Sequence, residues 1–241
     1  MPEAINENYE SYEQWKNWSG DCQCDSLCQR YFNGEFRNIP IHGRSVLEIG
    51  FGNGEFLAWA SSKGAQIFAT EINKKLVDAA KKRGFQVYYG NVDQISDLKN
   101  MQFDVVVAFD VFEHLTHDEL VKMLRFLHAH LADHGNIVIR VPNGQSPFGR
   151  LYQHGDMTHR NTLSINQFQQ ISMLLGFKVV RATNSFRVVN SSLKGLAQIF
   201  RNGLRNLIEI SLSKIYGFSR LPLDPNITVV LEKDCDIICD E

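Results

Sequence analysis

The segment Val46-Leu47-Glu48-Ile49-Gly50-Phe51-Gly52-Asn53-Gly54 leads a short apolar run into a glycine-rich turn, and a helix-like stretch follows from Glu55. Glycines allow the sharp turn and remove the Cβ atoms that would keep a ligand away from the end of the strand. The spacing is G-x-G-x-G, whereas dinucleotide-binding turns read G-x-G-x-x-G. Because Glu48 suits a cationic ligand better than a pyrophosphate, the segment predicts a site for a positively charged, nucleotide-like cofactor.

Apolar, strand-like runs recur along the chain, and helix-length segments lie between the early ones. The runs are 45–49, 66–70, 86–90, 103–109, 136–141, 177–182 and 227–231. Helices are expected at 73–83 and at 116–132, where Thr116 and Glu119 form a capping box. Strands that alternate with helices form a parallel sheet covered on both faces, and the continuously apolar run 103–109 is expected at its centre. The pattern predicts an α/β fold.

Polar residues follow the strands in an order that resembles the motifs of class I S-adenosylmethionine (SAM) methyltransferases, over about residues 45 to 142. Glu71 follows the second strand, about 20 residues after the glycine turn, where an acid binds ribose hydroxyls. Asn91 stands where the family has an aspartate beside adenine, and an amide can both donate and accept hydrogen bonds. The segment from Asp110 to His114 resembles the family's Asp-x-x-Glu-His, which passes along the methionine part of SAM.

The resemblance implies a Rossmann-like class I methyltransferase fold with a seven-stranded, mostly parallel sheet, and SAM as the cofactor. The cofactor-binding residues that we expect are Glu48, Gly50, Phe51, Gly52, Gly54, Glu71, Ile72, Asn91, Val92, Phe109, Asp110 and His114. A nicotinamide-binding domain is the rival interpretation. It would require a glycine three positions after Gly52, where the chain has Glu55.

A polar loop near 152–162 follows the fifth strand and carries His154, Asp156 and His159. Proton-handling groups this dense at the mouth of a cleft indicate catalysis. We expect His159 to be the general base, Asp156 to orient it, and His154 to be a substitute base or a substrate ligand. The structural alternative is that Asp156 and Thr158 cap the loop and His159 only packs.

The same loop resembles the Asp-x-Thr-His loop of methyltransferases from bacterial surface-polysaccharide pathways. These proteins also share an Asn-x-x-Val-Val end that resembles residues 226–230. The resemblance implies O-methylation of a sugar, a sugar nucleotide or a glycan precursor. SAM carries an electrophilic methyl group, so the protein has to align the acceptor oxygen and remove its proton.

A divalent metal is the alternative mechanism, which we do not favour. Asp110, Glu113 and His114 are similar to metal ligands of the ubiquinone-pathway O-methyltransferases and the small-RNA 2′-O-methyltransferases, with His154 or His159 as a fourth ligand. Such an ion would lower the pKa of an alcohol without a base. The acceptor would then be a small molecule or an RNA 2′-hydroxyl; a catalytically silent SAM-binding protein is a third interpretation, since Asn91 replaces an aspartate.

Charge and composition bear on which partners and which compartment we expect for the protein. The 241 residues have a formal net charge of -2, which provides no field to attract nucleic acid, and no apolar run approaches the ~18 residues of a membrane span. The polar N-terminus lacks the order of a signal peptide, so we expect a cytoplasmic protein. Its five cysteines, Cys22, Cys24, Cys28, Cys235 and Cys239, are expected to be reduced thiols, with a zinc site as the less favoured alternative.

Four parts of the chain are expected. They are an N-terminal helical lid over 1–44, a SAM-binding core over 45–190, an amphipathic helical insertion over 191–222, and the last strand with a tail over 223–241. Aromatic residues in the lid, such as Trp15 and Trp18, suit a cofactor cover or stacking on sugar rings, and equally suit ordinary packing against the sheet edge. Within the insertion, residues 191–220 have apolar side chains at helical spacing and basic ones on another face, which suits a helical cover or a peripheral contact with the inner membrane surface or a polyanionic acceptor.

Overall fold

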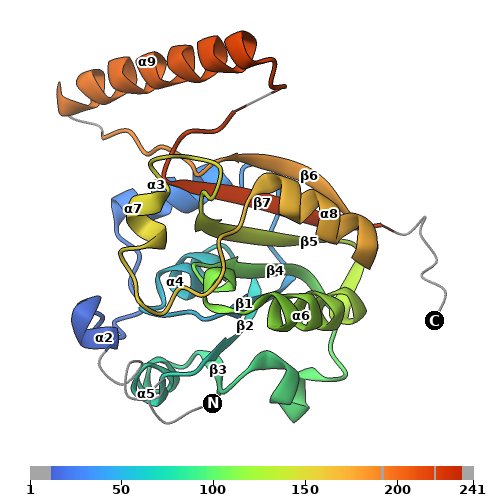
Figure 1. Ribbon diagram of the computed structural model, residues 1–241. Helices are drawn as coiled ribbons and strands as arrows, with labels where there is room; N and C mark the ends of the chain where they lie inside the picture. The colour runs from blue at the N-terminus through green and yellow to red at the C-terminus, as the bar shows by residue number, and fades with distance from the viewer. Residues whose placement is uncertain (1–11, 191–192, 220, 235–241) are drawn as a thin grey trace.

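The computed structural model describes residues 12–190, 193–219 and 221–234. Residues 1–11 of the expected lid and 235–241 of the expected tail, with Cys235 and Cys239, lie outside the described residues. At the centre is a seven-stranded sheet in the order β3-β2-β1-β4-β5-β7-β6 (Figure 1). The strands are β1 (Ser45–Ile49), β2 (Gln66–Glu71), β3 (Gln86–Tyr89), β4 (Phe103–Phe109), β5 (Leu131–Pro142), β6 (Phe177–Asn184) and β7 (Asn226–Lys233).

The first five strands pair in parallel, and β7 lies antiparallel between β5 and β6. The prediction of a mostly parallel, seven-stranded Rossmann-like sheet is therefore confirmed. Successive side chains of β4 point to opposite faces of the sheet, which explains its apolar run. Val106 and Ala108 face one apolar cluster, whereas Val105 and Val107 face another. Because both faces of the central strand are buried, both sets of side chains have to be apolar.

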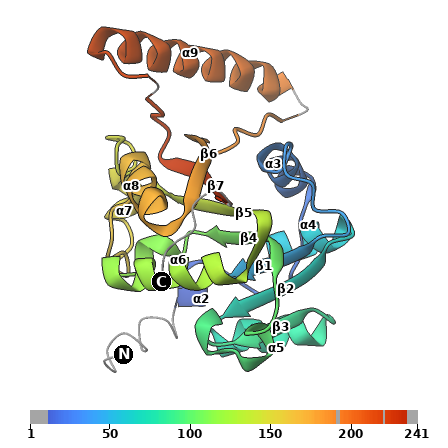
Figure 2. The same cartoon turned by 90° about the vertical axis from the view of Figure 1, so that its right-hand side faces the viewer.

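Helices cover the two faces (Figure 2). On one face α6 (His117–His130) and α8 (Ile165–Leu175) pack against the larger cluster, and on the other α3 (Ser26–Glu35) and α4 (Glu55–Ser62) contribute aromatic side chains. The remaining helical segments are α2 (Tyr12–Trp15), α5 (Lys74–Lys82), η1 (Val92–Gln94), η2 (Ser96–Leu98), η3 (Phe112–His114), α7 (Arg150–Gln153) and α9 (Leu193–Tyr216).

Local signals set most of the helix starts. Thr116 and Glu119 form the expected capping box of α6, and Ser164 with Gln167 forms one at α8. The end of α6 differs from the expectation, because the helix stops at His130 and β5 begins at once at Leu131 rather than at residue 136.

The expectation of reduced thiols is wrong for one pair, since Cys24 and Cys28 form a disulfide. Cys28 lies in the first turn of α3, and Asp25, the N-cap, accepts its backbone N–H. The cap brings the Cα atoms of the two cysteines to 5.3 Å, within the range that a disulfide requires. Cys22 is a buried free thiol.

Helix α9 lies apart from the sheet, beyond the end at which β6 is the edge strand (Figures 1 and 2). Within the residues that the structure describes, no helix has the length and apolarity needed to cross a bilayer.

Candidate active site

A cavity of about 730 Å³ lies at the carboxyl ends of β1, β2, β3 and β4. All of the predicted cofactor residues except Gly54 line it: Glu48, Gly50, Phe51, Gly52, Glu71, Ile72, Asn91, Val92, Phe109, Asp110 and His114. We call the part formed by residues 48–52, 71–73 and 90–92 the cofactor half. The part formed by His114, Thr158 and their charged neighbours is the acceptor half.

The glycine turn is shaped by its lack of side chains. Gly50 and Gly52 have φ of 68° and 53°, in the left-handed region that favours glycine. A Cβ atom on Gly52 would lie 3.0 Å from the Trp18 ring, which covers the turn and also lines the cavity. Gly54 does not line the cavity among the described residues, which corrects its assignment as a cofactor residue: it caps α4, and a Cβ atom there would lie 2.4 Å from Cys22 Sγ.

The Glu71 carboxylate is fixed by backbone groups. Its Oε1 accepts the N–H groups of Ile72 at 2.7 Å and Asn73 at 2.9 Å, and its Oε2 accepts Gly52 N–H at 3.0 Å. Burial raises the pKa of Glu71, while these three donors act to lower it. Since a carboxylate offers about four acceptor positions, one remains for a ribose hydroxyl. Glu71 can therefore hold the glycine turn and bind a ligand at the same time.

Glu48 provides a buried acid at the cavity wall. The residue is 4% exposed, and its Oε2 has no hydrogen-bond partner among the described residues. Burial, reinforced by the carboxylates of Glu71 and Glu55, raises the pKa of Glu48 well above its ordinary value. A buried polar atom without a partner is costly, and a cationic ligand in the cavity would supply one. SAM has this charge, so the cofactor half fits it.

Arg140, at the end of β5, was not predicted. Its Nε donates to Asp110 Oδ1 at 3.0 Å, its Nη2 pairs with Asp110 Oδ2, and its Nη1 donates to the Tyr31 hydroxyl at 3.1 Å. Burial raises the pKa of that tyrosine to about 12. The signal that could have indicated Arg140 is a lone charge in an otherwise apolar, buried strand. Asp110 is thus bonded to an arginine, and among the described residues it is not part of the group that could hold a metal, which corrects its place in the alternative metal set.

In the acceptor half, the loop after α7 is held against η3 by its backbone. The N–H groups of Arg160 and Asn161 donate to the Glu113 carbonyl at 2.8 and 3.0 Å. This anchor brings Thr158 to His114, with Thr158 Oγ1 3.0 Å from His114 Nδ1. Both residues line the cavity.

Asp156 orients this pair. It is buried and accepts both the Thr158 N–H at 3.0 Å and the Thr158 hydroxyl at 2.5 Å. Thr158 donates its single hydroxyl proton to Asp156, so the Thr158 oxygen accepts a hydrogen bond from His114 Nδ1–H. The lone pair of the imidazole is then on His114 Nε2. Burial, with His159 beside it, lowers the pKa of His114 to about 4, so the ring is neutral at neutral pH.

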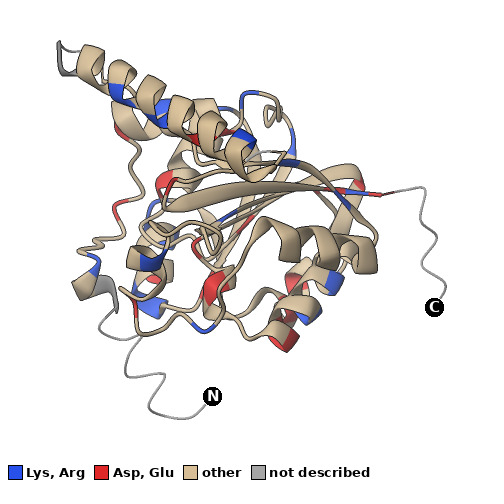
Figure 3. Ribbon diagram, turned by 45° about the horizontal axis from the view of Figure 1, so that its top comes forward, with Lys and Arg blue, Asp and Glu red and all other residues tan. Residues whose placement is uncertain are grey.

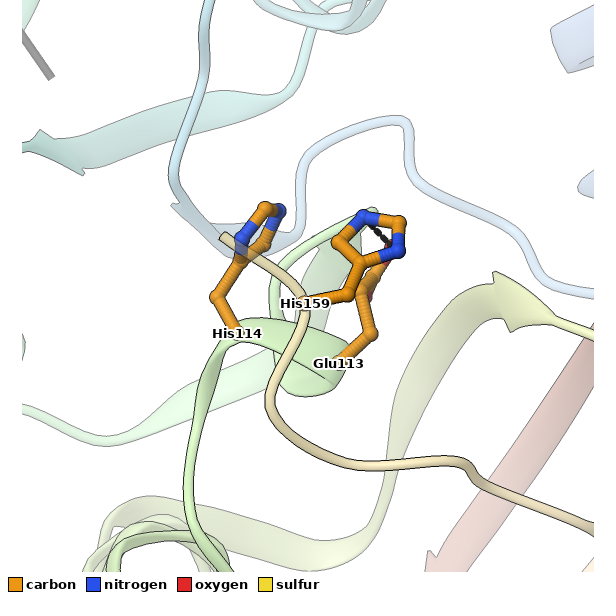
Figure 4. A group of neighbouring side chains, drawn as sticks. All are labelled: Glu113, His114 and His159. Atoms are coloured by element: carbon orange, nitrogen blue, oxygen red, sulfur yellow. Dashed lines mark ion pairs between the residues drawn. The ribbon is translucent and has the colours of Figure 1, made fainter. Parts of the chain in front are cut away.

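His159, the expected base, lies behind this pair and does not line the cavity among the described residues. Its side chain is 7% exposed, its ring centroid is 4.7 Å from that of His114, and its Nδ1 is 3.2 Å from the Gln153 carbonyl. The ring Nε2 is 3.9 Å from Glu113 Oε1 (Figure 4). The same nitrogen is 3.8 Å from Asp156 Oδ2. The structure therefore replaces His159 with His114 as the histidine at the cavity wall, because the loop backbone directs Thr158, rather than His159, into the cavity.

Two other site predictions change. His154 is exposed at the end of α7 and does not line the cavity among the described residues, so we withdraw it as a base. The residues that could hold a metal are Glu113, His114 and His159, each of which offers one ligand atom within 4.8 Å of the others. Burial raises the pKa of Glu113 well above its ordinary value and lowers the pKa of His159.

The outer part of the acceptor half is polar and charged. Lys16, Glu119, Lys122 and Arg160 line it, and Arg160 pairs with Glu119 at 3.1 Å. None of these four was predicted, because each is an ordinary surface charge in the sequence and only the fold places them around one cavity.

Solved methyltransferases share this fold. A SAM-dependent methyltransferase from Archaeoglobus fulgidus is 20% identical with a TM-score of 0.67, and the alignment covers 93% of this chain and 99% of that one. A TehB-like SAM-dependent methyltransferase from Corynebacterium glutamicum is 18% identical with a TM-score of 0.56, over 96% and 99% of the two chains. The plantazolicin methyltransferase BpumL, solved with SAH, is 16% identical with a TM-score of 0.51, over 96% and 89%.

At the level of sequence, a comparison with curated proteins finds no match. A family model does match: residues 9–182 fit the family described as a methyltransferase domain. That range contains the glycine turn, Glu71, His114 and Thr158, which together form the cavity described above. The chain belongs to the methyltransferase-domain family and is a SAM-dependent methyltransferase.

Proposed function

We propose that the chain methylates a hydroxyl group of a sugar or glycan precursor and that His114 removes the proton of that hydroxyl. The observation that carries the proposal is the hydrogen-bonded series Asp156, Thr158 and His114, which ends at the cavity wall. An alcohol is a weak nucleophile and needs a positioned base, and an imidazole that donates its Nδ1–H keeps its lone pair on Nε2, the atom that would take the proton.

The chemistry divides between cofactor and protein. When bound, SAM supplies a methyl group on a positively charged sulfur. Bound SAM, held by the cofactor half, would give this methyl group to the acceptor oxygen with cleavage of the carbon–sulfur bond, and His114 Nε2 takes the hydroxyl proton. Thr158 and Asp156 hold the ring in the tautomer that can take this proton, and the cavity aligns the two reacting atoms.

The charged rim supports a polar acceptor. Three cations line the acceptor half: Lys122, Lys16, which is 3.8 Å from Asp156 Oδ2, and Arg160, which pairs with Glu119. Together with these carboxylates they form a polar rim that suits hydroxyl-rich or phosphate-bearing molecules such as sugar nucleotides. The likeness of the loop to the Asp-x-Thr-His loop of surface-polysaccharide methyltransferases points to the same class.

The test is transfer of labelled methyl groups from SAM to a panel of free sugars, sugar nucleotides, glycan lipids, small phenols and RNA oligonucleotides. We expect a product on the sugar class that survives mild alkali, because a methyl ether is stable where a methyl ester is hydrolysed. His114→Ala should reduce transfer by about 10²–10⁴, and His154→Ala, an exposed histidine beyond the cavity, is the matched control. A product only on RNA or phenols, or an alkali-labile one, would overturn the proposal.

A second mechanism is favoured by the Glu113, His114 and His159 group. If a divalent ion is held there, EDTA should abolish turnover and the ion should restore it. Glu113→Gln and His159→Ala would then be as damaging as His114→Ala. Under the base mechanism, activity resists EDTA, and His159→Ala is milder than His114→Ala.

A further inference from the structure

Helix α9 turns its polar side toward the protein and its apolar side toward solvent, the opposite of an ordinary surface helix. Its polar residues Gln198, Glu209 and Ser213 face the rest of the chain, with Glu209 and Ser213 buried. Its apolar residues face solvent, with exposures from 44% to 76%: Leu196, Ile199, Phe200, Leu204, Leu207, Ile208, Ile210, Ile215 and Tyr216. A helix of a soluble domain normally buries the apolar stripe. An exposed apolar face of this extent indicates an interaction surface.

Polar contacts hold the helix in this orientation. Arg187 pairs with Glu209 at 2.7 Å, and Asn184 Nδ2 donates to the same carboxylate at 2.8 Å. At the other end, Gln198 Oε1 accepts Asn190 N–H at 2.7 Å. Among the described residues, no side chain of α9 belongs to the apolar clusters that hold the sheet and its helices together. The helix is fastened to the fold, yet its apolar face plays no part in the core.

The charges on α9 indicate which kind of partner its apolar face fits. Residues 193–216 contain a single acid, Glu209, which is turned inward and paired with Arg187. Arg201, Arg205 and Lys214 are exposed, although Arg205 is also 3.9 Å from Asp224 Oδ1 on the protein side. Basic positions recur along α9 in Figure 3. The outward side is therefore apolar with a positive margin. A second copy would bring equal positive charges together, whereas anionic lipid headgroups neutralise them.

We propose that α9 lies flat in the headgroup region of an anionic lipid bilayer, with its apolar face in the acyl boundary. A helix of 24 residues extends about 36 Å along such a surface. The exposed aromatic residues Tyr216 and Phe218 suit the boundary between headgroups and acyl chains. Arginine and lysine side chains at the margin reach the phosphates while their stems stay in the apolar layer. This surface is separate from the cavity and does not depend on which acceptor is methylated.

The test is sedimentation of the full chain with vesicles of phosphatidylcholine, with and without phosphatidylglycerol. We expect binding to the anionic vesicles and little binding to the neutral ones. The triple variant Phe200→Ser, Leu204→Ser, Leu207→Ser should weaken partitioning by about tenfold or more, because buried apolar area is lost. Arg201→Gln with Arg205→Gln should remove the preference for anionic vesicles.

The matched control is Met173→Ser with Leu174→Ser, two apolar side chains of α8 that are 78% and 72% exposed. These changes should leave partitioning unchanged, and calorimetry with SAM verifies that every variant is folded. Vesicle binding equal in wild type and the triple variant would overturn the proposal. The proposal would also be overturned if the wild-type protein did not bind vesicles. This holds whether the protein is a monomer or an oligomer that the triple variant dissociates.

Discussion

The two halves of the cavity are built by different kinds of contact. In the cofactor half, the Glu71 carboxylate binds backbone N–H groups of its own neighbours and of the glycine turn. In the acceptor half, His114 meets the Thr158 side chain, 44 positions along the chain. Backbone contacts at strand ends follow from the fold, whereas contacts between side chains depend on the path of a loop. The cofactor half is therefore more predictable from the sequence than the acceptor half.

The largest effect is expected from Gly52→Val, which targets the cofactor half. The residue has φ of 53°, and a Cβ atom there would lie 3.0 Å from the Trp18 ring, so a branched side chain obstructs the turn. Calorimetry should detect no SAM binding. Gly84→Val is the matched control, because Gly84 has φ of 84° but no neighbouring atom within 4 Å of its Cβ position. Normal SAM affinity in Gly52→Val would refute the placement of the cofactor.

Glu71→Ala should weaken SAM binding by about 1–3 kcal/mol, since a buried hydrogen bond to the ribose is lost and Gly52 N–H loses its acceptor. Asp97→Ala, which removes a carboxylate from the exposed segment after β3, is the control. If Glu71→Ala binds SAM as tightly as wild type, the acid serves only to hold the turn.

Thr158→Val tests the acceptor half. It keeps the shape of the side chain but removes the hydroxyl that joins His114 to Asp156. We expect kcat to fall about tenfold while SAM affinity is unchanged, because the imidazole is no longer held in one tautomer. Thr162→Val, at an exposed position of the same loop, is the control. A change confined to KM would mean that Thr158 binds the acceptor instead.

The smallest effect concerns stability. The pKa of Glu48 is raised above its ordinary value of 4.5 in the folded chain, so the folded state binds this proton more tightly than the unfolded state. Stability is then fully present below the unfolded pKa and is lost as the pH rises through the folded pKa. Glu48→Gln removes this loss, so the variant should resist urea better than wild type at neutral and alkaline pH, and equally at acidic pH.

The same variant should bind SAM more weakly, because an amide no longer attracts a cation. Urea titrations across pH, together with calorimetry, separate the two effects. A stability difference that grows toward acidic pH would contradict the assignment of Glu48 as a destabilising buried acid.

Several features could be read from the sequence because they are local. The strands 45–49 and 103–109 were predicted with the observed bounds, and the capping boxes at Thr116 and Ser164 start the observed helices. Period and capping depend on residues within a few positions of one another. The order of motifs along strands then predicts which strand ends meet.

Other features required the fold. The Arg140 pair with Asp110 and the choice of His114 over His159 depend on side-chain rotamers and on where a loop crosses the sheet. The disulfide of Cys24 and Cys28 depends on the turn that begins α3.

Helix α9 separates what the sequence predicts from what only the fold determines. The sequence alone determined that residues 193–216 are amphipathic, since period and composition are properties of the segment. Only the tertiary structure decided which side faces the protein, because the pairing of Glu209 with Arg187 is made between two elements. The sequence thus determined the fold and the cofactor half through local patterns repeated along strands. The tertiary structure decided which histidine lines the cavity, the charged rim and the outward face of α9, because each depends on contacts between residues that only folding brings together.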